Sequence, residues 1–308
     1  MLNARVKIRH LHAFTVVAQN QSFARAAETL AISQPAVSKT IGELEDILAT
    51  RLFDRQARGV RLTPSGLVLL RHAGPALRAL ETGLAQAGSD DVSAQPLRIG
   101  ALSTVETELL PLALQRWQLD WPTGQARVTV GASAFLLERL LVGKLDVVVG
   151  RMTDAREMHD LSYEHVYYEP LILVVRGDHP LAHVAAPEVS DLIAYPWVLP
   201  PPKTTLRPRV DAFWVRHGVA SPQQRLETLS LPISYRYTMV TDAIWVAPRD
   251  AVRTDLVNGT LYALPVALET EGGSVGFALN TSAPSSLARE AFCEAVRIVA
   301  ARRGAGET

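Results

Sequence analysis

The chain has 308 residues, 31 basic and 31 acidic side chains and a formal net charge of zero, and this length is enough for two or three domains. No apolar run approaches the ~20 residues that cross a bilayer, and the first residues lack the apolar core of a secretory signal, so we expect a cytoplasmic protein with no membrane partner. The single cysteine, Cys293, excludes an intramolecular disulfide and a cysteine-rich metal site, and we expect it to be a small buried residue of a C-terminal helix.

The charge is distributed unevenly along the chain. Residues 1–65 carry nine lysines and arginines against five acidic residues, so this segment has a net charge of +4 and the remainder −4. Four of the nine basic residues lie between Arg51 and Arg61. A net charge of zero argues against a nucleic-acid partner, but a basic N-terminal segment favours a phosphate backbone.

Three helical patterns open the chain. Apolar residues recur at helical spacing up to Ala18. Ser22 and Ser33 are suitable N-caps for two further helices, and Pro35 falls in the first turn of the last one, where its missing N–H has no consequence. Residues 51–62 follow as two short extended segments around a glycine. This order predicts a helix-turn-helix with a basic wing.

A long helix is predicted next. Thr63 and Pro64 are an N-cap and a first-turn proline, and the helical pattern continues to about Ala87. We expect Gly74-Pro75 to bend the helix. It is too long for a simple connector, so we predict that it forms a dimer contact. Its stripe of leucines comprises Leu67, Leu70, Leu77, Leu80 and Leu84.

Strand and helix patterns alternate in the rest of the chain. The small and polar stretch 88–95 marks a domain boundary. The alternation beyond it predicts mostly parallel sheets with helices on both faces, arranged as two lobes with a ligand cleft between them. The predicted strands are 97–101, 126–130, 145–150, 171–175, 197–199, 243–247 and 275–279, and the predicted helices are 105–117, 134–142, 207–217 and 285–302.

The stretch "SFARAAETLAISQPAVSKTIGELEDILATRLFDRQARGVRLTPSG" resembles the DNA-binding domain of the LysR-type transcriptional regulators. The domain order beyond it is similar to that family over nearly the whole chain. In the C-terminal half, "SYRYTMVTDAIWVAPRD" and "DHPLA" resemble the branch that controls protocatechuate catabolism, with sugar-utilisation regulators as close relatives. The chain departs from the family at Ala49, where a glycine usually ends the third helix, and at 240–243, where many members are rich in glycine.

The resemblance implies a winged helix-turn-helix over 1–65, a linker helix over 66–90 and a two-lobed α/β effector domain of the periplasmic-binding-protein type over 91–308. Lobe I would comprise about 96–165 and 268–303, and lobe II about 166–267. It also implies a transcriptional activator that acts as a homodimer or homotetramer on an inverted-repeat operator in double-stranded DNA, with RNA polymerase as a further partner.

The resemblance places the third helix in the major groove. Glutamine can form two hydrogen bonds with adenine, serine adapts to several base edges, lysine reaches guanine or phosphate, and the wing arginines suit phosphates or the minor groove. For each helix residue an ordinary solvated surface is the alternative, and Arg55 could instead pair with Glu45 or Asp46. The expected DNA-binding residues are Ser33, Gln34, Pro35, Ser38, Lys39, Arg55, Arg58, Arg61 and Thr63.

Polar side chains follow several of the predicted strands. Ser103 and Thr104 come after the first strand, where hydroxyls and a helix N-terminus could hold a carboxylate, although plain N-capping is an equal alternative. We therefore expect a small organic anion as the effector. The expected effector-binding residues are Ser103, Thr104, Ser133, Arg151, Lys203, Thr204, Thr205, Tyr235 and Arg236.

No pattern supports catalysis. The eight histidines are scattered and the H-E-x-x-H, G-x-S-x-G and phosphate-loop motifs are absent from the sequence. His179 and His183 are four apart, but Pro180 between them argues against a metal pair. We expect no enzyme activity, no metal and no cofactor. The competing class is a solute-binding protein with the same two-lobed domain, and a regulator of sugar uptake or use is the alternative within the family.

Overall fold

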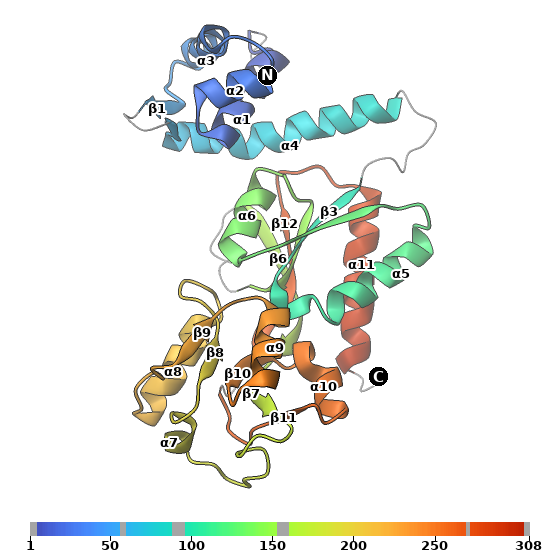
Figure 1. Ribbon diagram of the computed structural model, residues 1–308. Helices are drawn as coiled ribbons and strands as arrows, with labels where there is room; N and C mark the ends of the chain where they lie inside the picture. The colour runs from blue at the N-terminus through green and yellow to red at the C-terminus, as the bar shows by residue number, and fades with distance from the viewer. Residues whose placement is uncertain (1–4, 56–59, 88–95, 153–159, 269–271, 305–308) are drawn as a thin grey trace. The chain divides into compact units, whose positions relative to one another are not determined.

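The fold is described from a computed structural model, which covers residues 5–55, 60–87, 96–152, 160–268 and 272–304 (Figure 1). Contacts within the chain divide it into an N-terminal unit, mainly 1–95, and a C-terminal unit, mainly 96–308. No helix among the described residues combines the length and the apolar character needed to traverse a bilayer.

The N-terminal unit contains the predicted helix-turn-helix and wing. Ser22 Oγ accepts a hydrogen bond from Arg25 N at 3.3 Å, and Ser33 Oγ accepts one from Ala36 N at 3.4 Å, so both serines are the N-caps that the sequence predicts. The phenylalanine rings of the core lie 5.3 Å (Phe14 and Phe53) and 5.9 Å (Phe23 and Phe53) apart. The elements are α1 (Ile8–Asn20), α2 (Phe23–Thr29), α3 (Gln34–Leu48), β1 (Phe53–Arg55), β2 (Val60–Leu62) and α4 (Pro64–Ala87).

The helix α4 begins where the sequence predicts. Thr63 Oγ1 accepts a hydrogen bond from Gly66 N at 3.0 Å and donates one to the Arg51 carbonyl at 2.7 Å, so the cap also fixes α4 to the wing. The helix continues through Pro75 to Ala87. Leu70 packs into the core of the unit, whereas Leu80 and Leu84 are exposed.

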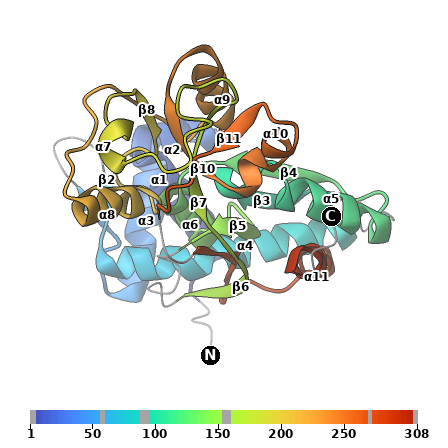
Figure 2. The same ribbon diagram turned by 90° about the horizontal axis from the view of Figure 1, so that it is seen from below.

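Lobe I of the C-terminal unit is a five-stranded sheet in the order β4-β3-β5-β12-β6. The helices α5 and α11 lie side by side (Figures 1 and 2) and pack against the central strands β3, β5 and β12. The Trp117 and Phe292 rings meet edge to face at 6.5 Å. Cys293 is buried in this core, and burial raises the pKa of its thiol to about 12, as expected of an inert cysteine. The elements are β3 (Leu97–Ala101), α5 (Leu109–Asp120), β4 (Ala126–Val130), α6 (Ser133–Leu141), β5 (Val147–Arg151), β6 (Leu161–Glu169), β12 (Gly273–Asn280) and α11 (Leu287–Gly304).

Lobe II is a second five-stranded sheet in the order β11-β7-β10-β8-β9. Its core includes Trp197 and Trp214, whose rings lie 4.4 Å apart. Arg207 binds both Asp211 and Glu227 at 2.8 Å and so joins the first turn of α8 to β9. The elements are β7 (Leu171–Arg176), α7 (Val189–Leu192), β8 (Trp197–Leu199), α8 (Arg207–His217), β9 (Arg225–Glu227), α9 (Leu231–Val240), β10 (Ile244–Pro248), α10 (Arg253–Val257) and β11 (Leu261–Ala263).

Two sequence-based expectations are wrong. The sheets are mixed rather than mostly parallel, since β12 is antiparallel to β5 and β7 is antiparallel to both β10 and β11. The chain crosses from lobe I to lobe II between β6 and β7 and returns to lobe I before β12. After each crossing the new strand enters its sheet from the end opposite to that used by its parallel strands, so β7 and β12 run antiparallel to β10 and β5. The helix predicted from residue 105 begins at Leu109, after a 3₁₀ turn at Ser103–Val105. This start places Pro111 in the first turn instead of the helix interior.

Ala49 closes α3 in the left-handed conformation that the family's glycine would adopt, with φ 51° and ψ 34°. Its N–H donates to Asp46 O at 3.3 Å, and Thr50 N–H donates to Glu45 O at 3.1 Å. This is the Schellman pattern of hydrogen bonds with alanine in the glycine position. The helix therefore ends as in the family, and the alanine side chain adds backbone strain.

We predict that Ala49→Gly raises the stability of the N-terminal unit by up to about 1 kcal/mol. Removing the left-handed strain of ~1–2 kcal/mol outweighs the extra entropy that glycine adds to the unfolded chain, ~0.5–1 kcal/mol. Urea unfolding of the full chain measures the change. Gly218→Ala is the matched opposite, because Gly218 ends α8 at φ 63° with open space around its Cα, and it should lower stability. A less stable Ala49→Gly variant would contradict the assignment of strain.

Candidate nucleic-acid interface and interlobe pocket

One face of α3 is apolar and buried, and the opposite face is exposed and polar. Val37, Ile41 and Leu44 pack into the core of the N-terminal unit. Gln34 and Lys39 are exposed and make no hydrogen bond or ion pair with any described residue. Pro35 lies beside them and is exposed, and Ser38 is half-buried. Donor and acceptor groups on this face are therefore free for an external partner.

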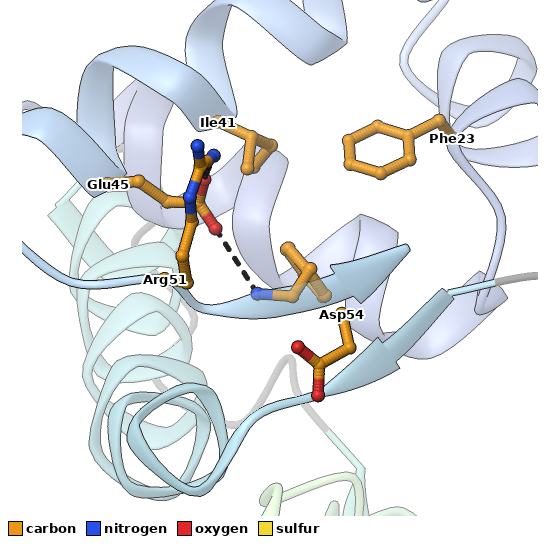
Figure 3. Close-up of a pocket in the computed structure, with 6 residues that line it drawn as sticks. Phe23, Ile41, Glu45, Arg51 and Asp54 are labelled. Atoms are coloured by element: carbon orange, nitrogen blue, oxygen red, sulfur yellow. Dashed lines mark hydrogen bonds and ion pairs between the residues drawn. The ribbon is translucent and has the colours of Figure 1, made fainter. Parts of the chain in front are cut away.

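Glu45 faces the interior from the last turns of α3 and holds the start of the wing. Its side chain is 8% exposed, and Oε1 accepts hydrogen bonds from the backbone N–H groups of Leu52 at 2.7 Å and Phe53 at 3.2 Å. Oε2 binds the Arg51 guanidinium at 2.9 Å, and that side chain is 79% exposed. Figure 3 shows Glu45 and Arg51 together at a hollow of about 460 Å³, which Phe23 and Ile41 also line.

The wing residues of the predicted interface are placed only in part. Arg61 is exposed on β2 and lies directly opposite Asp54 on β1. Thr63 serves as the cap of α4. The backbone of Arg55 belongs to β1, while its side chain and the whole of Arg58 lie outside the described residues. Glu45, one of the two partners considered for Arg55, binds Arg51.

Glu45 was considered only as a partner of Arg55, and its backbone contacts were missed. The available signal was its spacing, because Glu45 follows the core residue Ile41 by four positions and therefore faces the same side of the helix. An acid at a core-facing position needs buried donors, and here the wing backbone supplies them.

A small pocket lies between the two lobes of the C-terminal unit. Five of the predicted effector-binding residues line it, with backbone and apolar groups between them. Its volume is about 20 Å³, which has room for roughly one water molecule. The predicted residues that the fold brings together here are Ser103, Thr104, Ser133, Thr204 and Thr205.

Some hydroxyl groups of this small pocket, called the inner pocket below, can still form hydrogen bonds with a ligand. Ser133 is buried at the first turn of α6, and its Oγ has no hydrogen-bond partner among the described residues. Thr104 Oγ1 accepts from Arg151 N at 3.3 Å, which leaves its own O–H available, whereas Thr204 Oγ1 donates to Pro201 O at 2.8 Å. The first N–H groups of α6 also lack intrahelical partners. The pocket therefore offers donors to a ligand acceptor.

A wider hollow of about 360 Å³ adjoins the inner pocket, and Ser103, Gly131 and Leu229 line both. Its other walls are mostly apolar and come from both lobes. Glu106 also lines it, and partial burial raises the pKa of that carboxyl. The remaining lining residues are Val130, Ser230, Leu231 and Pro232.

Four predicted effector-binding residues line neither hollow. Arg151 is the last residue of β5, and its buried guanidinium packs against Gly273 of the adjoining strand and donates to Glu169 O at 3.1 Å. Lys203 is exposed on the loop before α8, with a positive φ of 65°. Tyr235 and Arg236 lie further along α9. Consequently, no arginine or lysine among the described residues lines the two hollows.

The stretch 240–243, where the family is often rich in glycine, uses its side chains within lobe II. Asp242 binds the Arg176 guanidinium at 2.7 Å, and its carbonyl oxygen lies 3.2 Å from His179 Nε2. Ala243 is fully buried. These residues stabilise the end of α9 and add no group to either hollow.

Comparison with known proteins covers nearly the whole chain. Residues 8–67 match the model of the bacterial regulatory helix-turn-helix proteins of the lysR family, and residues 90–301 match the LysR substrate binding domain. The HTH-type transcriptional regulator PcaQ of Agrobacterium fabrum is 36% identical over 309 residues, covering 100% of this chain and 99% of that protein.

Solved structures share the fold. A full-length OxyR variant from Pseudomonas aeruginosa has a TM-score of 0.69 at 24% identity, with 96% of each chain covered. Full-length CbnR in complex with its target DNA has a TM-score of 0.54 at 21% identity, with 96% of this chain and 100% of that chain covered. The mixed sheets and the helical N-terminal unit are thus a known architecture.

We predict that Glu45→Ala destabilises the N-terminal unit by about 2–4 kcal/mol, because two buried N–H groups lose their acceptor. Glu45→Gln retains one acceptor oxygen for Leu52 and Phe53 and should cost about 1 kcal/mol. Urea unfolding of the full chain measures both changes. Asp46→Ala, at the exposed neighbouring position, is the control. Equal stabilities of Glu45→Ala and Asp46→Ala would refute the wing-anchoring role.

Proposed function

Because this chain belongs to the LysR family of DNA-binding transcriptional regulators, we propose that it reads an operator with α3 and adjusts transcription when a small organic anion enters the interlobe cleft. Family membership makes the chain a regulator rather than an enzyme. It also counts against the solute-binding class, which has no helix-turn-helix domain.

The free polar face of α3 carries the proposal for DNA reading. Gln34 can bind an adenine edge through two hydrogen bonds, Lys39 can reach a guanine or a phosphate, and Pro35 can contact a thymine methyl group. Ser33 and Ser38 lie on the same helix start and suit several base edges. Arg55, Arg58 and Arg61 would contribute mainly contacts to the DNA backbone. Thr63 would act indirectly, because its hydroxyl donates to Arg51 O and fixes α4 to the wing.

We propose that α4 joins two chains. Leu80 and Leu84 are exposed on it, and Leu84 is 67% exposed, so a second copy that covers them would remove apolar surface from water. Two α3 helices would then meet half-sites spaced by about one turn of DNA, and two such dimers would form a tetramer that contacts RNA polymerase. Sedimentation analysis of the full chain tests this assembly, and a monomer at micromolar concentration would contradict it.

The cleft proposal rests on the unpartnered Ser133 Oγ beside the first turn of α6. A carboxylate oxygen placed there would accept the serine O–H and backbone N–H bonds at a helix N-terminus. Ser103, Thr104 and Thr205 would complete the hydroxyl shell, and Thr204, whose hydroxyl donates to Pro201 O, would form part of its wall. Binding would shift the lobes toward one relative pose, and that shift would alter the grip of the assembly on DNA.

The pathway proposal follows from the resemblance to regulators of protocatechuate catabolism. The mostly apolar outer hollow suits an aromatic acid. A regulator of sugar uptake or use is the second candidate, since several hydroxyl groups line the inner pocket. A thermal-shift screen with protocatechuate, its ring-cleavage products and simple sugars separates the two.

We predict that Lys39→Gln weakens binding to duplex DNA and makes the dependence of log K on log salt concentration shallower by ~0.9, the value for one lost phosphate contact. Fluorescence anisotropy with a labelled duplex at several salt concentrations measures both. Lys203→Gln removes an exposed lysine of lobe II and should leave the slope unchanged. An unaltered slope in Lys39→Gln would show that Lys39 makes no phosphate contact. If the unmodified chain bound no duplex DNA at low salt, the proposed DNA-binding function would be refuted.

We predict that Ser133→Ala weakens effector binding by about 10- to 100-fold, the effect of losing one hydrogen bond to a charged group. The readout is the ligand-induced rise in melting temperature for each compound of the screen. Ser190→Ala, at an exposed serine of α7, is the control. A Ser133→Ala variant that responds like the unmodified chain would place the effector elsewhere.

A further inference from the structure

We propose that Glu106 makes the cleft select a ring compound with a single carboxylate at one end and a hydroxyl group at the other, and reject di- and tricarboxylates. The inference rests on the proposed function of the cleft and deepens it by naming the class of ligand. It follows from the position, burial and lack of partners of one carboxyl group.

Glu106 and the inner pocket share one turn of the chain. Ser103 and Thr104 line the inner pocket, and Glu106 follows them at the end of the same 3₁₀ turn, with its N–H 3.5 Å from Ser103 O. Ser103 lines the outer hollow as well. A ligand that reaches from Ser103 into the outer hollow therefore comes to the wall that Glu106 helps to form.

The charge of Glu106 is uncompensated. Its side chain makes no hydrogen bond or ion pair with the described residues, and the lining residues of both hollows include no described arginine or lysine. Half-burial disfavours the charged form, so the pKa is raised. A second carboxylate placed beside this group would be repelled, whereas a hydroxyl would donate a hydrogen bond to it.

The two ends of the cleft thus favour different chemical groups of a ligand. Around Ser133 the protein presents an unpartnered hydroxyl and the start of α6, which favour an anion. Around Glu106 it presents an acceptor among mostly apolar walls, which include Val130 of lobe I and Leu231 and Pro232 of lobe II beside the hydroxyl residues Ser103 and Ser230. A volume of about 360 Å³ is at the small end of ligand pockets and suits a single ring.

The experiment is calorimetric titration of the full-length chain with four para-substituted probes: 4-hydroxybenzoate, benzoate, terephthalate and 4-(aminomethyl)benzoate. We expect 4-hydroxybenzoate to bind at least tenfold more tightly than benzoate or terephthalate, the effect of one hydrogen bond to a charged acceptor. In Glu106→Gln we expect the hydroxyl preference to fall below threefold and terephthalate to bind at least tenfold more tightly than in the unmodified chain. Glu138→Gln removes an exposed charge from α6 and should keep the original order.

Several outcomes overturn the proposal. These are an unchanged order of affinities in Glu106→Gln, equal binding of terephthalate and 4-hydroxybenzoate by the unmodified chain, preferential binding of the ammonium probe, or no binding of any probe. The melting temperature of ligand-free Glu106→Gln shows whether the variant is folded, and Glu106→Asp, which keeps the charge, should still disfavour terephthalate.

Failure of this inference is distinguishable from failure of the proposed function. DNA binding without ligand tests the regulator on its own. Ser133→Ala should weaken all four probes together, whereas Glu106→Gln should change only their order. If Ser133→Ala weakens every probe while Glu106→Gln alters nothing, the cleft binds the anion and Glu106 has no part in selection.

Discussion

The buried Glu45 carboxylate holds the helix α3 and the wing in one arrangement. One of its oxygens accepts both N–H groups at the start of the wing, while Phe53 packs against two core rings. Glu45 also lies within one turn of the strained helix end at Ala49. The direction in which the chain leaves α3 and the position of β1 are therefore set together, and the exposed faces of both elements keep a fixed relation to each other.

Local signals in the sequence predicted the elements that have caps and prolines at their ends. Ser22, Ser33 and Thr63 cap helices as expected because a cap bonds only to residues within three positions. Ser230 and Pro232 are the same kind of cap and first-turn proline for α9, a helix that is not among the predicted elements. The direction of β12 and the pairing of three-residue strands such as β9 and β11 were not predictable in this way, because they depend on contacts between distant segments.

In the cleft, too, the residues set by local sequence were predictable and those set by contacts between distant segments were not. Its hydroxyl residues were predictable because polar groups after parallel strands gather at one sheet edge. Arg151 met the same criterion, but β5 extends one residue further and the side chain packs beneath β12 instead. Glu106 was missed because its surroundings include Leu231 and Pro232, which come from the other lobe, and no spacing in the sequence brings them together.

For the effector site proposed above, the narrowness of the inner pocket has a kinetic consequence. A space for about one water molecule cannot admit an organic acid while the lobes keep this separation. Capture of the ligand would then wait for the lobes to part, and the association rate would reach a plateau at high ligand concentration instead of rising with diffusion. Dissociation of the ligand would require the same opening of the lobes. Such a regulator would respond to sustained changes in metabolite level and average over brief ones.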